Sequence, residues 1–476
     1  MNEKMNDEKD MLGKQPVGKL LLKLALPTVT AQIINMLYNI VDRIYIGHIP
    51  GVGAAALTGV GVCMPLIMIV TAFAAFAGYG GAPRASIFMG QGDPESAEKT
   101  LGNCFSTQIA ISIVLTAALL LWNRDFLMAF GASENTIEYG VSYMNIYAIG
   151  TIFVQLTLGM NAFITAQGFA KTGMLSVLIG AVANIVLDPI FIFTFDMGVQ
   201  GAALATIISQ AMSCAWVLAF LLGKKTRLKI RAKNLILQAR IILPSLALGL
   251  SSFIMQASES VIFVCFNASL LKYGGDIAVG AMTILSSVMQ FAMLPLQGLG
   301  QGAQPIISYN YGARNADRVR AAFKILLKAS LCYSVALWAL IMLFPQGFAA
   351  LFTDASELIE YTKTALRIYA ASLLLFGIQI ACQMTFTSLG NAKASILVAV
   401  MRKFILLIPL IYILPLIFPD AQATAVYAAE PVADFLAVSF TAVLFTFQFK
   451  KSLAGLPGGD GTEPALPDEK TQPTSL

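Results

Sequence analysis

The chain has 476 residues, of which 57% are hydrophobic and 12% are charged. Soluble domains carry about 25% charged residues, so this composition excludes a soluble enzyme. The net charge of +5 gives no indication of nucleic-acid binding, because the basic residues lie between apolar runs rather than along one face. We therefore expect a polytopic membrane protein.

Twelve apolar stretches follow one another along the chain, and each is long enough to cross a bilayer as a helix of about 20 residues. Their approximate ranges are 20–46, 53–82, 100–122, 139–164, 173–195, 199–222, 241–268, 277–305, 323–344, 364–388, 394–418 and 423–448. Helices are expected because an open sheet edge cannot face lipid. The predicted fold class is an all-α polytopic membrane protein with twelve transmembrane helices.

The distribution of basic residues predicts the orientation of these helices. An even number of spans places both termini on one side, and lysines and arginines are concentrated in the loops on that side. Examples are the N-terminal segment, the stretch 223–240 and the loop that begins at Arg314. The positive-inside rule then predicts cytoplasmic termini in a multi-pass protein of the cell membrane.

An internal repeat divides the chain into two halves. An offset of 222 residues aligns 130–172 with 352–394 without a gap, and 11 of these 43 positions are identical. Two copies of a six-helix unit have the same orientation in the membrane, so they form a parallel repeat of the kind found in transporters.

The repeat and the basic segment between its copies define the expected domains. Residues 1–14 form a cytoplasmic N-terminal tail, and 15–222 form the first six-helix lobe. Residues 223–240 form a basic cytoplasmic linker, and 241–450 form the second lobe. The remaining residues, 451–476, are rich in Pro, Gly and acidic side chains and are expected to be a disordered cytoplasmic tail.

Cysteine and histidine give no indication of a metal or redox site. The six cysteines lie inside apolar runs without C-x-x-C spacing, and His48 is the only histidine. We expect buried free thiols, no disulfide, and no bound cofactor or metal apart from a coupling ion.

Ionisable residues in the spans are informative, because each costs roughly 2.5–3.5 kcal/mol at the centre of a membrane helix. On the first helix Asn35, Tyr38, Asn39 and Asp42 are spaced i, i+3, i+4 and i+7, so they form one polar stripe. This stripe must face protein or water. Alternatively, Asp42 only points to the outer interface beside Arg43.

The fifth helix carries a second polar group at a matching depth. Asn184 and Asp188 lie on one face, and Pro189 has no N–H to donate to the carbonyl of Ile185. A free carbonyl, an amide and a carboxylate are suitable ligands for a cation, and Asp42 lies about as far from the outer surface as Asp188. The alternative is an ordinary hydrogen bond between helices.

The second lobe differs in its chemistry. Glu259 is the repeat partner of Asp42 at an offset of 217, but Leu406 and Leu410 replace Asn184 and Asp188. Asp434, Glu430 and Arg402 are the other ionisable groups noted in its spans. We expect a cargo cavity lined from both lobes by polar and soft side chains. Its candidate residues are Asn35, Tyr38, Asn39, Gln256, Glu259, Met289, Met293 and Gln383.

Several motifs resemble those of the MATE (multidrug and toxic compound extrusion) transporters, and most closely their bacterial MepA-type branch. These are ALPT at 25–28, YNIVDRIYIGHI at 38–49, NAFITAQG from Asn161, NIVLDP from Asn184 and YNYGARNADRVR from Tyr309. The resemblance extends over about residues 15–450. It implies two six-helix bundles arranged as a V, and export of varied, often cationic compounds in exchange for protons or sodium ions.

The resemblance also implies site residues. In some members of the family the first lobe binds the coupling cation, and the matching positions here are Asp42, Asn184 and Asp188, with Tyr143, Asn161 and Thr206 as looser matches. Other members use a carboxylate on the seventh helix, which Glu259 matches. The acidic partner that some carry on the tenth helix is absent, since Gln379 and Gln383 occupy that region.

The expected function is secondary antiport of drug-like cations. We expect the protein to act as a monomer surrounded by membrane lipid and to bind no nucleic acid. A related alternative is a flippase for a lipid-linked precursor, which needs a cationic cavity, whereas the charges noted in the spans are mainly acidic. An enzyme lacks a catalytic constellation here, and an ATP-driven pump lacks a G-x-x-x-x-G-K-[ST] motif. The choice between proton and sodium and the identity of the drugs stay open at this point.

Overall fold

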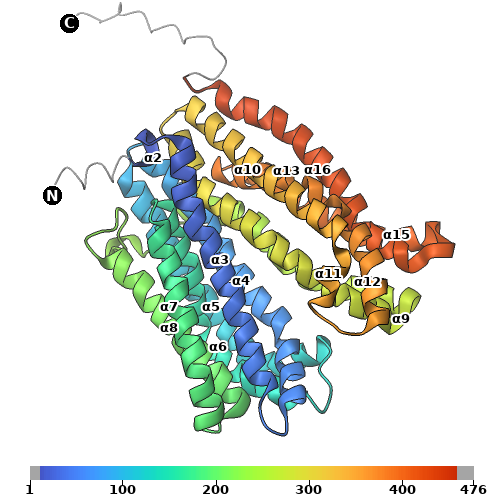
Figure 1. The fold of residues 1–476 in the computed structure, drawn as a ribbon. Helices are drawn as coiled ribbons and strands as arrows, with labels where there is room; N and C mark the ends of the chain where they lie inside the picture. The colour runs from blue at the N-terminus through green and yellow to red at the C-terminus, as the bar shows by residue number, and fades with distance from the viewer. Residues whose placement is uncertain (1–10, 458–476) are drawn as a thin grey trace, which may run out of the picture.

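The computed structural model describes residues 11–457, and nearly all of them lie in helices (Figure 1). No strand occurs within this range. The tail predicted from residue 451 therefore falls mostly outside the described residues, although its first four residues still belong to the last helix.

The first half of the chain forms a bundle of six long helices preceded by one short helix. Its elements are α2 (Met11–Lys14), α3 (Val17–Gly47), α4 (Gly53–Gly90), α5 (Pro94–Ala129), α6 (Ile137–Ala166), α7 (Ala170–Pro189), the π-helical turn η1 (Ile190–Thr194) and α8 (Gly198–Leu222).

The second half forms the other bundle after a short 3₁₀ turn in the linker. Its elements are η2 (Ala232–Asn234), α9 (Ala239–Gly312), α10 (Ala316–Leu343), α11 (Pro345–Ala350), α12 (Ser356–Tyr369), η3 (Ala370–Ser372), α13 (Leu373–Ser388), α14 (Ala392–Val400), the π-helical turn η4 (Met401–Leu407), α15 (Ile408–Ile417), η5 (Pro419–Ala421) and α16 (Gln422–Ala454).

Eleven helical segments of the described chain are long and apolar enough to cross a membrane, but α9 contains two spans. Its 74 residues would make one helix about 110 Å long, against a hydrocarbon core of about 30 Å. The helix breaks at Gly275, which has φ 67° and ψ −164°. This conformation is favourable only for glycine. The chain therefore has twelve spans, which confirms the predicted fold class.

The turn between the second and third helices of each lobe displays the internal repeat in three dimensions. Gly92 and Arg314, which are 222 residues apart, both have positive φ values of 77° and 57°. The next residues, Asp93 and Asn315, each cap the following helix by accepting a hydrogen bond from a backbone N–H, over 3.0 and 3.1 Å. The two halves thus reuse one local design with different side chains.

The two lobes contact each other in the half of the molecule at which the described chain begins and ends. The Thr28 hydroxyl donates to the carbonyl of Gly298 over 2.6 Å, and Gln32 donates to Gln301 over 3.2 Å. A side chain at Gly298 would meet the backbone of Val29. These close approaches join α3 to the second span of α9.

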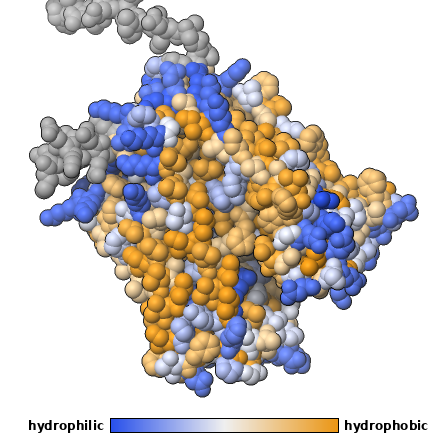
Figure 2. All heavy atoms as spheres, viewed as in Figure 1, coloured by the Kyte–Doolittle hydropathy of each residue, from blue (hydrophilic) through white to orange (hydrophobic). Residues whose placement is uncertain are grey.

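Away from these contacts the two bundles diverge, as α3 and α12 show in Figure 1. Figure 2 shows a hollow between the lobes on the side away from the chain ends, with hydrophilic atoms inside it. The outer surface of both bundles is largely hydrophobic between hydrophilic ends in this view. The lobes therefore form a V whose opening faces away from the two ends of the described chain.

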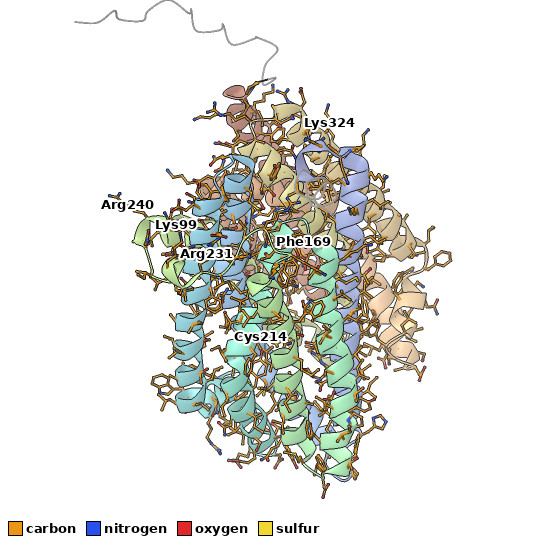
Figure 3. All side chains as sticks on the ribbon, turned by 90° about the vertical axis from the view of Figure 1, so that its left-hand side faces the viewer. Lys99, Phe169, Cys214, Arg231, Arg240 and Lys324 are labelled. Atoms are coloured by element: carbon orange, nitrogen blue, oxygen red, sulfur yellow. The ribbon has the colours of Figure 1, made fainter. Side chains whose placement is uncertain are left out.

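The basic linker is fastened to the first lobe. The side-chain oxygen Oε1 of Gln167 accepts three hydrogen bonds from the linker, namely from the Thr226 hydroxyl and from two backbone N–H groups. Arg231 forms an ion pair of 2.6 Å with Glu98, and Asn103 accepts from the backbone of Gln238 over 2.6 Å. Figure 3 shows Arg231 and Arg240 beside Lys99 at this end of the bundle.

All six cysteines, at positions 63, 104, 214, 265, 332 and 382, are free. Four of them are buried and Cys265 is half-buried, but Cys332 is exposed, so the expectation of a buried thiol is wrong at this position. His48 follows the end of α3 and places its Nδ1 2.7 Å from the carbonyl oxygen of Ile44.

Candidate functional site

The first lobe brings two acidic side chains together inside the bundle. Asp42 comes from α3 and Asp188 from α7, two helices that pack against each other. Their exposed fractions are 9% and 0%, and the two carboxyl groups are close enough to interact directly. We refer to Asp42, Asn184, Asp188 and Thr206 as the first-lobe acidic site.

Hydrogen bonds satisfy only part of this site. Asn184 Nδ2 donates to Asp188 Oδ1 over 3.2 Å and lies 3.5 Å from the Thr206 hydroxyl. Among the described residues, no donor reaches Asp42 Oδ1, Asp188 Oδ2 or Asn184 Oδ1. A buried oxygen without a donor is costly, so these three oxygens favour a proton or a cation between them.

No basic side chain neutralises the two acids directly. In the described part of the chain, none of the ion pairs within 4.0 Å includes Asp42 or Asp188. The same residues contain no group of three or more His, Cys, Asp or Glu side chains of the kind that holds a transition metal. Two carboxylates, an amide oxygen and a hydroxyl suit a hard cation or a proton instead.

The helix that carries Asp188 changes its winding directly after this residue. Pro189 supplies no N–H, and the next turn is π-helical, with the Phe195 N–H donating to the carbonyl of Ile190 over 2.9 Å. Such wider turns occur often at functional sites. Local chain geometry therefore places the acid at the end of a regular helix, next to a segment whose bonding pattern differs.

A small cavity of about 30 Å³ adjoins the site. It is lined by Asn35, Tyr38, Thr157, Leu158, Val177, Gly180, Ala181, Asn184, Thr206, Ser209, Gln210 and Ser213. A volume of this order can hold one water molecule or one small ion. The polar lining distinguishes it from an empty apolar packing defect.

The remaining first-lobe candidates occupy different places. Tyr143 is buried, interacts with the Thr206 hydroxyl and stacks on Tyr147, with ring centroids 6.1 Å apart. Asn161 instead donates to the carbonyl of Gly173 over 3.2 Å. Gly173 lies 15 residues before Asp188 on the same helix, which corresponds to about 22 Å, so Asn161 is not part of the first-lobe acidic site.

The polar stripe on α3 is only partly directed to this site. Tyr38 and Asn35 line the cavity, whereas Asn39 is half-buried and donates to the backbone carbonyl of Asn35 over 2.6 Å. Asp42 is the residue of the stripe that meets α7.

The second lobe holds five ionisable side chains that pair with one another. Lys403 lies 2.7 Å from Glu259, and Arg402 lies 2.6 Å from Asp434 and 3.3 Å from Glu430. We call these five residues the second-lobe charge network. The Ser372 hydroxyl also donates to Asp434 over 2.9 Å, and the guanidinium of Arg402 lies 4.8 Å from the ring centroid of Phe376.

The inward position of both basic residues depends on a π-helical turn. In a regular α-helix successive side chains point about 100° apart, yet Arg402 and Lys403 are exposed by only 5% and 2%. They lie in η4, where the wider turn allows both to face protein. Sequence reasoning noted Arg402 but missed Lys403. The signal for it was available, because an adjacent Arg-Lys pair in the middle of an apolar run is expensive unless both charges are paired.

The repeat relates these basic residues to the first-lobe cavity. Positions 402 and 403 correspond to Gly180 and Ala181 at the offset of 222, and both of these small residues line the cavity beside Asn184. The first lobe therefore has open space where the second lobe has two cationic side chains.

The other candidates for the cargo cavity lie in the second lobe. Met289 and Met293 are half-buried and pack against its main hydrophobic core, and Gln256 is half-buried on the first span of α9. Gln383 is engaged in packing, because its Nε2 donates to the Ser395 hydroxyl over 2.8 Å. Neither side-chain polar atom of Gln379 has a hydrogen-bond partner among the described residues.

The comparison with known families decides the classification. The profile of the MatE family matches residues 27–190 and 251–413, which together make up more than half of the chain. The chain belongs to the MatE family. The match is split into two blocks, one in each lobe. MatE proteins are membrane transporters and not enzymes, in agreement with the twelve spans found here.

Named relatives of this MatE chain include multidrug export proteins. It is 23% identical over 405 residues to the multidrug export protein MepA of Staphylococcus aureus (strain NCTC 8325 / PS 47), covering 85% of this chain and 89% of that protein. It is 23% identical over 423 residues to MepA of Staphylococcus haemolyticus (strain JCSC1435), covering 89% and 92%. The expected resemblance to MepA-type MATE transporters is thus confirmed.

Solved structures support the fold. A structure described as the outward-facing conformation of a multidrug resistance MATE family transporter matches with a TM-score of 0.87 at 23% identity, over 93% of this chain and 98% of the other. A transporter from Pyrococcus furiosus Vc1 (DSM3638), described as having a binding pocket of reverse polarity, matches with a TM-score of 0.85 at 23% identity, over 94% and 98%.

Proposed function

We propose that this MatE protein is a secondary active exporter of drug-like compounds, driven by antiport of protons or sodium ions through the first-lobe acidic site. The observation that carries the proposal is that Asp42 and Asp188 interact with each other while, in the described part of the chain, neither forms an ion pair with a basic side chain. The printed names of the MepA relatives support the export of multiple drugs.

The two acids suit a coupling role because of their charge. Two buried carboxylates side by side repel each other strongly, and they coexist when a proton or a cation lies between them. The oxygens of Asp42, Asn184 and Asp188 that have no hydrogen-bond partner are available to bind this proton or cation. Loading and release of one cation therefore change the energy of the contact between α3 and α7. A bound ion can favour one arrangement of these helices over another.

The charge balance of the spans favours cationic cargo. The first-lobe acidic site and the second-lobe charge network together contain five carboxylates and two cationic groups. This excess of negative charge disfavours the alternative of a lipid-linked precursor flippase, whose pyrophosphate cargo needs cationic ligands. We place the cargo in the hollow between the lobes, held by the soft and aromatic side chains of its walls.

The V-shaped arrangement fits transport by alternating access. In this proposal both termini are cytoplasmic, so the hollow opens to the outside and the contact of Thr28 with Gly298 closes the cytoplasmic side. Inward opening then requires the lobes to separate at this contact. The protein acts as a monomer in the cell membrane, with lipid around both bundles.

Transport in vesicles tests the proposal. The purified protein is reconstituted, and ethidium movement is followed while a proton gradient and a sodium gradient are imposed separately. We expect one gradient to drive ethidium accumulation and an uncoupler or ionophore to abolish it. Transport of neutral sugars or anionic lipids without any transport of ethidium would replace this proposal with the flippase alternative.

A further inference from the structure

The ion pair between Glu259 and Lys403 differs from the other pairs of the second-lobe charge network. Arg402, Glu430 and Asp434 are all buried, with side-chain exposures of 8% or less. The Lys403 side chain is 3% exposed, but the Glu259 side chain is 52% exposed. One oxygen of Glu259, Oε1, is bonded to the lysine, and among the described residues no hydrogen-bond donor is bonded to Oε2.

The position of Glu259 places this exposed carboxylate at the boundary between the lobes. The next residue, Ser260, contacts the sulfur of Met68 on α4 over 3.9 Å. About two turns earlier, Phe253 packs on Phe73 of α4, with ring centroids 4.8 Å apart. Glu259 also follows Gln256 by three residues, so the two lie on the same side of α9. The exposed part of the carboxylate is therefore accessible from the interlobe region.

The network as a whole carries one excess negative charge. Glu259, Glu430 and Asp434 contribute three carboxylates, and Arg402 and Lys403 contribute two cations. Arg402 pairs with two acids that are both buried, so neither of them is exposed to a cargo molecule. The accessible side of Glu259 is where an additional cation can reach the network.

We propose that the ammonium of Lys403 is a built-in competitor for cationic cargo at the Glu259 carboxylate, from which a bound cargo displaces it. The inference rests on the proposed export of cationic compounds and assigns one residue that sets their affinity. The repeat supports it, because the equivalent of Lys403 in the first lobe is Ala181, which leaves open space beside Asn184 of the first-lobe acidic site.

A displaced Lys403 has a second partner in the network. Glu430 lies close enough to the lysine to interact with its charge, and it is held by Arg402 at 3.3 Å, which leaves room for another donor. Movement of the ammonium from Glu259 to Glu430 keeps it paired while cargo is bound. Release of the cargo lets the lysine return, so the exchange favours weak and reversible binding rather than a permanent complex.

The exchange also predicts selectivity. A compound with a fixed positive charge and an apolar body gains from Glu259, whereas an uncharged compound of the same shape leaves the ion pair with Lys403 intact. The strength of the internal ion pair thus decides how much a cargo charge contributes to affinity. A stronger internal partner lowers cargo affinity, and a missing one raises it.

The test uses the full-length purified protein in detergent and follows ethidium binding by fluorescence anisotropy. Lys403→Met should tighten ethidium binding by about tenfold, which corresponds to roughly 1.4 kcal/mol. Lys403→Arg should weaken it, because arginine can hold the carboxylate with two parallel hydrogen bonds. Glu259→Gln should weaken it as well, and Lys403→Met should then bring no further gain. Lys324→Met, on an exposed lysine of α10, is the matched control and should bind as the wild type does.

The uncharged parent of ethidium, which lacks the N-ethyl group, should bind equally to all variants. If the Lys403→Met protein does not fold, the opposite variant Lys403→Arg, which keeps the charge, decides the question. Wild-type affinity in both Lys403 variants would overturn the inference, and gradient-driven export by the wild type would still support the proposed function. Failure of the wild type to bind and export ethidium would overturn both.

Discussion

The two lobes share a helical plan but neutralise their buried acids in opposite ways. In the first lobe Asp42 and Asp188 face each other with unpartnered oxygens and a cavity of about 30 Å³ nearby. In the second lobe Arg402 and Lys403 project from the repeat-equivalent positions of Gly180 and Ala181 and pair with three acids. A duplicated bundle can thus keep one copy open to an ion from solution while the other copy contains its own cations.

The largest expected effect concerns the internal cation of the second lobe. Arg402→Met leaves Asp434 and Glu430 buried together without their shared partner. Removing one member of a buried ion pair typically costs about 3–5 kcal/mol, so we expect a clear loss of thermal stability in detergent. Further removal of the acids, by Glu430→Gln and Asp434→Asn, should recover part of this loss. An unchanged melting temperature of the single variant would contradict the structural role of the network.

The corresponding change in the first lobe should have the opposite character. Asp188→Asn removes a buried charge that has no basic partner, so stability should be unchanged or slightly higher. Gradient-driven ethidium transport in vesicles should fall to the background of protein-free vesicles. Asp42→Asn should behave in the same way. Full transport by both single variants would disprove the assignment of these acids as the coupling pair.

Introducing a positive charge into the first lobe tests whether the small side chain at position 181 is needed for ion coupling. Ala181→Lys introduces an ammonium at the first-lobe equivalent of Lys403, beside Asn184 and the cavity. We expect transport to lose its dependence on the imposed ion gradient, because the site then contains its own cation. Ala181→Met is the control for side-chain length. Equal losses in the Lys and Met variants would show that packing, and not charge, is responsible.

A smaller effect is expected from the proline that follows Asp188. Pro189→Ala supplies an N–H to this part of α7 and favours a regular turn in place of η1. If the altered winding serves coupling, ion-driven transport in vesicles should decline more than ethidium affinity in detergent. Parallel losses in both measurements would mean that Pro189 contributes only to packing.

The smallest expected effect lies at the paired helix caps. Asp93 accepts from the Ser96 N–H, and hydrogen bonds to Ser96 lower the pKa of the Asp93 carboxyl below its usual value. Its contribution is therefore present above the unfolded pKa of about 4 and is lost as pH falls through the lower folded value. The cap is worth about 1 kcal/mol. Asp93→Asn should remove this pH dependence, because its repeat partner Asn315 caps without titrating; thermal unfolding between pH 5 and pH 3 measures the difference.

The architecture was predictable from the sequence because the length of each apolar stretch and the internal repeat are patterns that extend over many residues. The pairing of Asp42 with Asp188 was also foreseeable, because both acids lie at about the same distance from the outer membrane surface and few other polar groups occur at that depth. Whether the pair couples transport stays a prediction. The break of α9 at Gly275 agrees with two separately expected spans.

What the sequence did not reveal depends on local departures from regular helix. Lys403 was overlooked because a regular helix would turn it about 100° away from Arg402, and η4 removes that separation. Asn161 matched a family motif, yet side-chain direction gives it a backbone partner at Gly173. Prediction from residue spacing assumes ideal helix geometry. It therefore fails where the helix winding changes, and where a side chain can form a hydrogen bond with either of two neighbours.

The attachment of the linker to the first lobe determines where the molecule can pivot. Gln167 grips the segment near Thr226, and Asn103 holds the backbone of Gln238. The connection between the lobes is therefore held to the first lobe along much of its length, and little of it is free to accommodate motion. The opening turns of α9 around Pro244 also pack closely on α4, because a side chain at Gly80 would meet the backbone of Ser245. Any rotation of one bundle against the other therefore has to change this contact. The lobes are thus joined by a short, firmly held connection and not by a flexible loop.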